Sequence, residues 1–159
     1  MTIHFEPIGF IRTPYSRREG MPIQAKGAQG AKGRIILKEA LEPGLKDLDG
    51  FSHLILIYHF HQSTGYELET TPFLDAILRG VFATRAPRRP NPIGFSVVRL
   101  TGIEGHVLYI EGVDMLDETP LLDLKPYLAD FDVFEPEREG WLEDKAKYLH
   151  HTRSDERFG

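Results

Sequence analysis

Residues 85–92 read RAPRRPNP and combine a stiff backbone with fixed positive charge. Pro87, Pro90 and Pro92 each fix their own φ angle and push the preceding residue toward an extended conformation. A loop held in this way loses little conformational entropy when it binds a ligand. A plain connection between two strands needs neither the prolines nor the arginines, so the stretch is a candidate binding site.

The polar side chains of this loop have chemistry suited to a nucleotide. We predict that Arg88, Arg89 and Asn91 are displayed on the rigid loop. The two arginines suit phosphates, and Arg85 suits a carboxylate, which a guanidinium binds through two parallel hydrogen bonds. The amide oxygen of Asn91, between two prolines, suits the amino group of an adenine. A rigid surface connection with solvated arginines is the simpler alternative.

A second candidate segment, GVDMLDETPLLDLKPYLADFD, spans residues 112–132 and gathers acids around Lys125 and Tyr127. These acids are Asp114, Asp117, Glu118, Asp123, Asp130 and Asp132. Carboxylates in this setting can bind ribose hydroxyls, orient Lys125 or act as a base. The alternative for this segment is a solvated acidic loop.

The stretch HLILIYHFHQ, residues 53–62, predicts a strand that ends at the rim of a pocket. Strand alternation places apolar and aromatic side chains on one face, namely Leu54, Leu56, Tyr58 and Phe60. Two histidines of the other face, His59 and His61, have the spacing of a metal pair, but no third ligand is evident. We therefore expect no metal site and favour Phe60 as a stacking group.

Short runs of branched and aromatic residues, nearly all closed by glycine or proline, predict strands. They cover residues 4–13, 34–38, 53–61, 80–85, 94–103 and 106–116, with a hairpin turn at 102–107. Weaker helix signals predict one turn within 42–51, a helix over 71–80 and a C-terminal helix over 135–151. Strands at this spacing predict a mainly β fold, a single small antiparallel β-barrel with a short C-terminal helix.

Composition restricts the function further. The 159 residues suit one domain, and the lack of cysteine excludes disulfides, thiolate catalysis and iron–sulfur clusters. Neither the longest apolar run nor the N-terminus predicts a membrane span or a secretion signal, so we expect a cytoplasmic protein. The net charge is −5, yet residues 76–103 hold five arginines and no acid. Such a local basic surface favours binding of an anion at one place.

The sequence GVFATRAPRRPNPIGFSVVRL, residues 80–100, resembles the signature of the TsaA-like family, the tRNA methyltransferase O group. Four further stretches agree with that family in order: IGFIRTPY, PIQAKG, FSHLILIYHFHQ and DMLDETPLLDLKPY. The combination is specific although each piece alone is not. We assign residues 1–135 to one domain and residues 136–159 to a C-terminal helix and tail.

Membership of this family implies a small β-barrel that binds S-adenosylmethionine near the subunit interface of a homodimer. The implied reaction is methylation of N6 of N6-threonylcarbamoyladenosine beside the anticodon of tRNA. Carried over onto this sequence, the cofactor contacts are Gln24, Ala25, Lys26, Phe60, His61, Arg85, Asp114, Met115, Leu116, Asp117 and Thr119. The implied substrate contacts are Arg88, Arg89, Asn91, Asp123 and Lys125, and the implied catalytic residues are Asn91, Asp117 and Tyr127.

Methyl transfer from a sulfonium depends mainly on positioning, while the N6–H must lose its proton as the methyl arrives. In this reading Asn91 holds the base, and Arg88 or Arg89 binds the threonyl carboxylate. The proton acceptor is open between Asp114, Asp117, Asp123 and Tyr127. The absence of a glycine-rich nucleotide fingerprint after a strand agrees with a barrel rather than a doubly wound methyltransferase.

Two departures from the family pattern matter. Glu118 in DETP stands where the family usually has glycine, so we expect a strained or reshaped turn if that position needs a positive φ. Many bacterial members carry a further C-terminal domain that helps to grip tRNA. We expect this chain, which shows one predicted helix after DFDVF, to lack that domain.

Two other functions fit the same residues. A binding module for an adenosine-containing ligand or for RNA would need the same basic loop, and cofactor turnover distinguishes it from an enzyme. A metal-dependent hydrolase would use His59, His61 and an acid from residues 114–123, and indifference to a chelator would exclude it.

Overall fold

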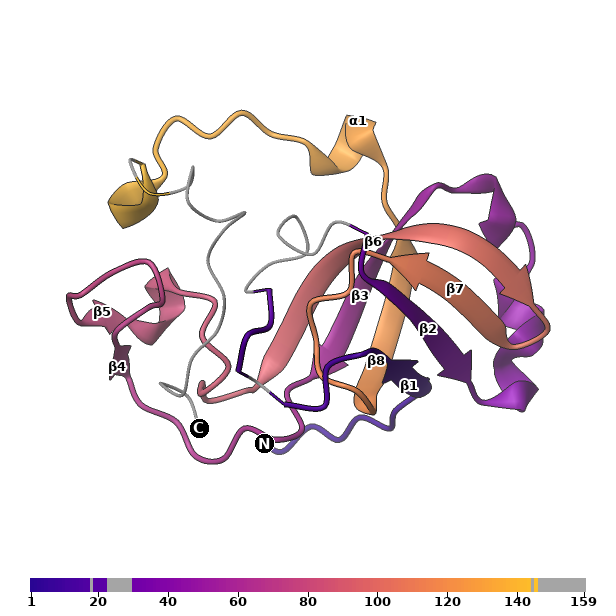
Figure 1. Ribbon diagram of the computed structural model, residues 1–159, viewed down its shortest axis with the longest axis horizontal. Helices are drawn as coiled ribbons and strands as arrows, with labels where there is room; N and C mark the ends of the chain where they lie inside the picture. The colour runs from indigo at the N-terminus through magenta and orange to yellow at the C-terminus, as the bar shows by residue number, and fades with distance from the viewer. Residues whose placement is uncertain (18, 23–29, 144, 146–159) are drawn as a thin grey trace.

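The computed structural model describes residues 1–17, 19–22, 30–143 and 145. Within them, six strands form a closed barrel in the order β1-β2-β7-β6-β3-β8, in which every neighbouring pair is antiparallel (Figure 1). The strands are β1 Gly9–Arg12, β2 Lys32–Leu37, β3 His53–His59, β6 Ile93–Glu104, β7 Val107–Glu111 and β8 Thr119–Pro126. The predicted small antiparallel β-barrel is confirmed.

Alternating burial along the strands builds the core. In β3, Leu54, Leu56 and Tyr58 point inward and are buried, while the residues between them are half-exposed, as the sequence pattern predicted. The same alternation buries Ile11, Ile35, Leu37, Val98, Leu108, Ile110 and Leu121. Removal of this apolar surface from water is the main favourable contribution to folding.

Strand β6 links the core to the proline-rich loop. Its first half pairs with β3, from His59↔Ile93 to His53↔Arg99, and its second half pairs with β7. The β6–β7 turn has a φ of 56° at Gly105, a left-handed conformation that glycine adopts without strain. The hairpin predicted at 102–107 is thus confirmed. Because β6 begins directly after Pro92, the barrel fixes the C-terminal end of the loop.

Smaller elements lie outside the barrel. The hairpin of β4 (Glu69–Thr70) and β5 (Arg79–Gly80) continues into a 3₁₀ turn, η4 (Val81–Ala83), and lies to the left of the barrel in Figure 1. The 3₁₀ helices η2 (Glu39–Leu45) and η3 (Leu48–Gly50) connect β2 to β3, where one turn was predicted. The helix α1 (Ala129–Asp132) and the 3₁₀ turn η5 (Gly140–Leu142) follow β8.

The helix predicted over residues 71–80 and the strand predicted over 80–85 are both wrong. The carboxylate of Asp75 accepts hydrogen bonds from the N–H of Ala76 and from the Arg79 side chain, which holds this segment in turns. The chain then pairs β5 with β4, and the strand ends at Gly80 before η4 begins. Local side-chain bonding therefore overrides the helical spacing of the apolar residues.

Two expectations after residue 112 also need correction. Residues 119–126 form the barrel strand β8, although a solvated acidic loop was an alternative for that segment. Residues 135–139 are not helical, so the helix predicted over 135–151 is wrong at its start. Residues 144 and 146–151 of that prediction lie outside the described residues, and the short helix near the C-terminus is α1.

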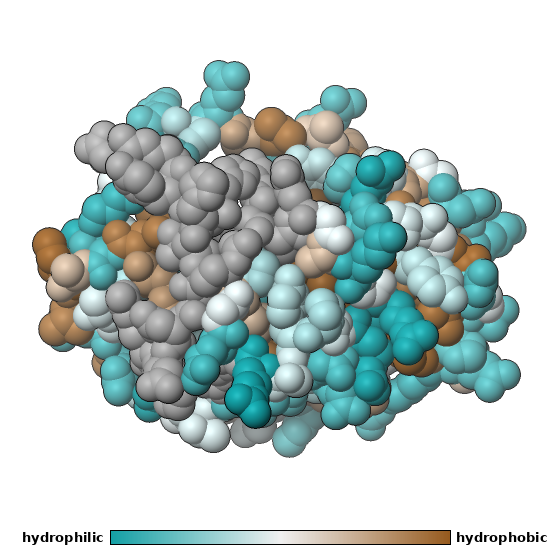
Figure 2. Space-filling model, in the orientation of Figure 1, coloured by the Kyte–Doolittle hydropathy of each residue, from teal (hydrophilic) through white to brown (hydrophobic). Residues whose placement is uncertain are grey.

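Hydrophobic side chains gather on the surface over the β4–β5 hairpin, at the left of Figure 2. The exposed apolar and aromatic residues of this region are Tyr66, Leu68, Ile77, Leu78 and Phe82. None of the helices in the described part of the chain is long and apolar enough to cross a membrane.

Candidate active site

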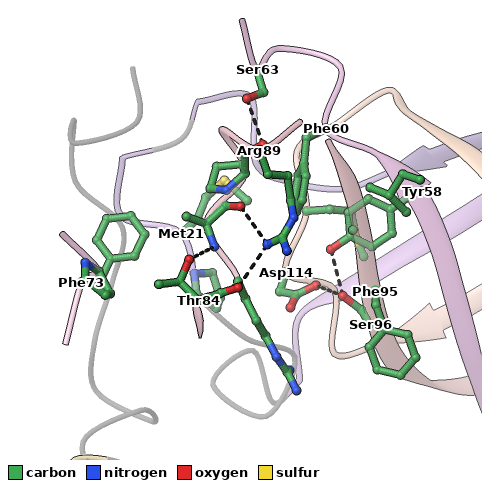
Figure 3. Close-up of a pocket in the computed structure, with 18 of the residues that line it drawn as sticks. Met21, Tyr58, Phe60, Ser63, Phe73, Thr84, Arg89, Phe95, Ser96 and Asp114 are labelled. Atoms are coloured by element: carbon green, nitrogen blue, oxygen red, sulfur yellow. Dashed lines mark hydrogen bonds between the residues drawn. The ribbon is translucent and has the colours of Figure 1, made fainter. Parts of the chain in front are cut away.

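A pocket with a volume of about 1320 Å³ lies between the barrel and the segment that carries β4 and β5. Figure 3 shows that it is lined by Tyr58 and Ser96 from barrel strands, by Asp114 from the connection between β7 and β8, and by residues outside the barrel, including Phe73 and Arg89. Pockets for a single drug-sized ligand span roughly 300–1,000 Å³. This pocket is therefore large enough for a nucleoside cofactor together with part of a second ligand.

Most of the predicted site residues meet in this pocket. Phe60, His61, Arg85, Arg89, Asn91, Asp114, Met115, Leu116 and Thr119 line it. Arg88, Asp117, Asp123, Lys125 and Tyr127 are not among its lining residues. Gln24, Ala25 and Lys26 lie outside the described residues.

The proline-rich loop, whose sequence predicts a stiff backbone, is also hydrogen-bonded to the rest of the chain at both of its ends. The hydroxyl of Ser63 donates to the Pro87 carbonyl at 3.1 Å, and the N–H of Phe60 donates to the Pro92 carbonyl at 2.8 Å. Between these anchors Asn91 is exposed toward the pocket. Its side-chain amide takes no hydrogen-bonding partner from the described residues, so it is available to a ligand.

The two arginines inside the loop are half-buried rather than displayed. Arg89 turns back on the loop, where its Nη1 donates to the carbonyls of Thr84 at 3.1 Å and Ala86 at 3.3 Å (Figure 3). Arg88 points to Glu67, with Nη2 to Oε1 at 3.8 Å, and its buried Nε has no partner within the described part of the chain. Arg89 therefore stabilises the shape of the loop, and the exposed Arg85 is the guanidinium best placed for an anion in the pocket.

The turn at residues 114–119 is fastened to strand β1. The Asp117 carboxylate accepts a hydrogen bond from the N–H of Thr13 and pairs with Arg12, each at 3.0 Å, which accounts for its position outside the pocket. Glu118 has a φ of 61°, so the position does adopt the left-handed conformation expected where the family usually has glycine. For a residue with a side chain this conformation costs about 1–2 kcal/mol. Arg12 also pairs with Glu118 at 3.1 Å.

Three further candidates lie along β8 and just beyond it, away from the pocket. Asp123 and Lys125 pair with each other at 2.6 Å on the outer face, opposite Ile57 and Ile55 of β3. Tyr127 follows the end of β8 opposite to Thr119, and its N–H donates to the His53 carbonyl. The structure therefore does not bring Asp123, Lys125 or Tyr127 to the ligand site.

Tyr58 and Ser96, which sequence reasoning missed, form a polar chain with Asp114 at the pocket. The Ser96 hydroxyl donates to the Asp114 carboxylate at 2.6 Å, and the Tyr58 hydroxyl lies 3.0 Å from Ser96 (Figure 3). Tyr58 and Ser96 are both buried, at 4% and 2% exposure. The sequence did offer one indication of this polar chain. Ser96 is a polar residue at an inward position of a predicted strand, between Gly94 and Val98, and a buried hydroxyl needs a hydrogen-bonding partner.

The C-terminal segment contacts the β4–β5 hairpin through a cluster that we call the latch, formed by Asp75, Arg79, Trp141 and Lys145. Trp141 also lines the pocket. The Asp75 carboxylate pairs with both Arg79 and Lys145 at 2.7 Å. Trp141 donates from Nε1 to the Ala83 carbonyl at 2.8 Å, and both cations lie within 6 Å of its ring, at 5.8 and 5.7 Å. One wall of the pocket is therefore supplied from beyond α1.

The latch is expected to depend on the charge of Asp75. The hydrogen bond from Lys145, with that from Arg79, holds the pKa of Asp75 well below its usual range, against the opposing effect of burial. A carboxyl whose pKa is depressed by folding stabilises the folded state above its unfolded pKa of about 4, and that contribution is lost as the pH falls through the folded value.

Asp75→Asn is therefore expected to release Trp141 at pH 7, whereas the wild type should release it only in acid. Trp141 is the chain's one tryptophan, so its fluorescence reports on the latch directly. We expect a red-shifted emission in Asp75→Asn and an unchanged emission in the exposed control Asp130→Asn. Identical spectra for Asp75→Asn and the wild type at pH 7 would show that the latch does not hold the segment.

Histidines and acids do not assemble into a metal site in the described part of the chain. No group of three or more potential ligands occurs there. The ring of His61 faces the Thr119 hydroxyl, with 3.5 Å between Nδ1 and Oγ1. The pocket is lined by an amide, a guanidinium, a carboxylate and aromatic rings, a set of groups suited to binding a nucleoside.

The sequence model of the tRNA-methyltransferase O N-terminal domain matches residues 10–133. The matched residues include the proline-rich loop, β6, the 114–119 turn and β8. The chain belongs to this family. The resemblance seen in the sequence is thus confirmed over nearly the whole barrel.

Relatives of this tRNA-methyltransferase O family member carry two kinds of name. A probable S-adenosyl-L-methionine-binding protein of Pyrococcus abyssi is 48% identical over 158 residues, which cover 99% of this chain and 86% of the relative. The human tRNA (adenine(37)-N6)-methyltransferase is 33% identical over 134 residues, which cover 80% of this chain but 30% of the relative.

Solved structures agree with the family fold. A crystal structure of TrmO from Pseudomonas aeruginosa superposes with a TM-score of 0.75 at 38% identity, over 89% of this chain and 63% of that one. The chain thus spans less than two thirds of the crystallised relative and about a third of the human one.

Proposed function

We propose that this protein is an S-adenosylmethionine-dependent methyltransferase that methylates N6 of N6-threonylcarbamoyladenosine in tRNA. The names of its relatives support the cofactor and the class of reaction. The observation that carries the proposal is the pocket itself, where the amide of Asn91 and the guanidinium of Arg85 share one cavity with Asp114. A tRNA substrate fits the cytoplasmic location expected from the sequence.

The cofactor is proposed to bind at the side of the pocket formed by β3 and the 114–119 turn. Aromatic and apolar groups there suit an adenine ring. The proposed contacts among the described residues are Phe60, His61, Met115, Leu116 and Thr119. The family resemblance adds Arg85 and Asp114, which also line the pocket and to which we assign roles toward the base instead. Gln24, Ala25 and Lys26 remain proposed contacts by family resemblance.

The modified base is proposed to enter from the side of the proline-rich loop. Asn91 is proposed to hold the N6 region of the base. Because the guanidinium of Arg89 donates to backbone carbonyls, the exposed Arg85 is the arginine suited to the threonyl carboxylate. Arg88, which does not line the pocket, is proposed to contact tRNA phosphates. We keep residues 1–135 as the catalytic domain and assign residues 136–159 to a C-terminal extension.

A homodimer is also proposed, because an apolar strip runs from the pocket onto the outside of the barrel. Ile93 and Phe95 line the pocket and are exposed, at 42% and 52%. In the β3–β6 register Phe95 lies opposite Ile57, which extends the strip across two strands. Exposed apolar patches of this kind mark interfaces. Light scattering is expected to give twice the mass of the chain, and a monomer mass would contradict the dimer.

The function is tested with S-adenosylmethionine that carries a label in its methyl group. The protein is incubated with two tRNA pools, one containing N6-threonylcarbamoyladenosine and one from cells unable to make it. We expect label to enter the first pool only. Label in both pools would contradict the proposed base.

A non-catalytic binding module is the alternative function. It predicts saturable binding of S-adenosylmethionine, measured by calorimetry, without label in either tRNA pool. Because cofactor binding and methyl transfer are measured on one preparation, the two functions are separated in a single experiment.

A further inference from the structure

One acid of the four proton acceptors considered from the sequence faces the ligand site. Asp117 is held by Arg12 and the N–H of Thr13. Asp123 lies on the outer face of β8, and Tyr127 lies past its far end. Asp114 alone among them lines the pocket, in which Asn91 also lies.

The Asp114 carboxylate is oriented from behind by two buried hydroxyls. Ser96 has a single hydroxyl proton, and its 2.6 Å bond to Asp114 Oδ1 uses that proton. The Tyr58 hydroxyl, 3.0 Å away, must therefore donate to Ser96. The chain runs from Tyr58 through Ser96 to the carboxylate, and each bond polarises the next.

Tyr58 is suited to remain the donor at the start of this chain. Burial, and then the nearby Asp114 carboxylate, raise the pKa of the Tyr58 hydroxyl above its usual range. The phenol therefore keeps its proton throughout the neutral range. Its ring is also fixed in place, because it packs edge-on against Phe60 at 5.5 Å and lies over Gly94 of β6.

We propose that Asp114 is the general base of the methyl transfer and that Ser96 and Tyr58 are its positioning residues. This inference rests on the proposed function. The N6 nitrogen attacks the methyl carbon of the cofactor, and the carbon–sulfur bond breaks to leave S-adenosylhomocysteine. The N6 proton passes to the Asp114 carboxylate, which later releases it to water. The methylated N6 is left uncharged and the threonyl carboxylate keeps its charge. The positive charge of the sulfonium leaves with the proton, so atoms and charge balance.

The assignment is tested by single-turnover transfer of labelled methyl to tRNA that carries N6-threonylcarbamoyladenosine, at saturating S-adenosylmethionine. Loss of a general base costs about 10²–10⁴-fold, so we expect Asp114→Asn to lower the rate constant by at least about 100-fold. Ser96→Ala removes one bond to a charged group and is expected to cost about 10-fold. Tyr58→Phe, which keeps the ring, should cost less than Ser96→Ala.

Cofactor affinity separates this role from a structural one. Calorimetry with S-adenosylmethionine is expected to give dissociation constants within about threefold of wild type for Ser96→Ala and Tyr58→Phe, since an oriented base acts on the rate rather than on binding. Ser96→Thr, which keeps a hydroxyl, should recover part of the rate. The exposed Asp49→Asn serves as a matched control with unchanged rate and affinity.

Each other result overturns a specific claim. A wild type that binds cofactor but transfers no methyl contradicts the proposed function itself. If the wild type is active but Asp114→Asn keeps its rate, Asp114 is not the base. Parallel losses of rate and affinity in Ser96→Ala would make Asp114 a cofactor contact instead.

Discussion

Asn91→Ala is expected to lower the rate of methyl transfer by about 100-fold, because misplacement of a reacting group by even 1 Å can cost that much. Asn91 is exposed in a loop whose ends are fixed by the Ser63–Pro87 and Phe60–Pro92 hydrogen bonds. Removal of its amide is therefore expected to leave the loop in place and to remove only the group that we propose holds the base. Transfer is measured in single turnovers with labelled cofactor.

The affinity for S-adenosylmethionine should change little in Asn91→Ala, since the proposed cofactor contacts lie on β3 and the 114–119 turn. Ser52→Ala is a matched truncation of a polar group near the opposite end of β3 and should leave both rate and affinity unchanged. An equal loss of rate and affinity in Asn91→Ala would show that Asn91 belongs to the cofactor site and not to the base.

Gly94→Ala is expected to lower the melting temperature and to disrupt the pocket. A Cβ at this position would lie 2.1 Å from the Tyr58 ring, which is buried and bonded to Ser96 and so has little room to move. Overpacking of this kind typically costs about 1–3 kcal/mol. In a chain of this size that corresponds to a fall of roughly 2–12 °C in melting temperature.

Gly102→Ala provides the matched control on the same strand. A Cβ there would lie 3.7 Å from Tyr109, an ordinary contact distance. We expect its melting temperature and its cofactor affinity to stay near those of wild type, while Gly94→Ala loses both. Equal melting temperatures for the two variants in a thermal scan would mean that Tyr58 can move aside freely.

Local features of the fold were predictable because they depend on neighbours in sequence. The alternation of Leu54, Leu56 and Tyr58 predicts which face of β3 is buried, since strand geometry fixes that period. The turn at Gly105 follows from the same kind of local rule. Residues 71–80 show the limit of such rules, because the side chain of Asp75 bonds to Ala76 and Arg79 and replaces a helix with turns.

In the loop over residues 86–92, one feature was predictable from the sequence and another was not. Its rigidity followed from three prolines, whose φ angles are fixed by their own rings. The direction of each arginine side chain could not be predicted from the sequence, because it depends on hydrogen-bond acceptors outside the proline pattern. Arg89 finds the carbonyls of Thr84 and Ala86, and Arg88 points to Glu67.

The sequence by itself thus determined the barrel class, the stiff basic loop and the family. The first two depend on local residue patterns, and the family is recognised from its motifs. The tertiary structure alone decided which of the candidate proton acceptors lines the pocket. The irregular register between Ile57 and Tyr58 in the β3–β8 pair leaves Asp123 on the outer face. Closure of the barrel brings Tyr58, Ser96 and Asp114 into hydrogen-bonding contact, although 38 and 18 residues separate them along the chain. The Tyr58–Ser96 contact depends on the pairing of β3 with β6, and Asp114 reaches Ser96 from the connection between β7 and β8. Both depend on how distant parts of the chain come together, which the sequence analysis did not predict.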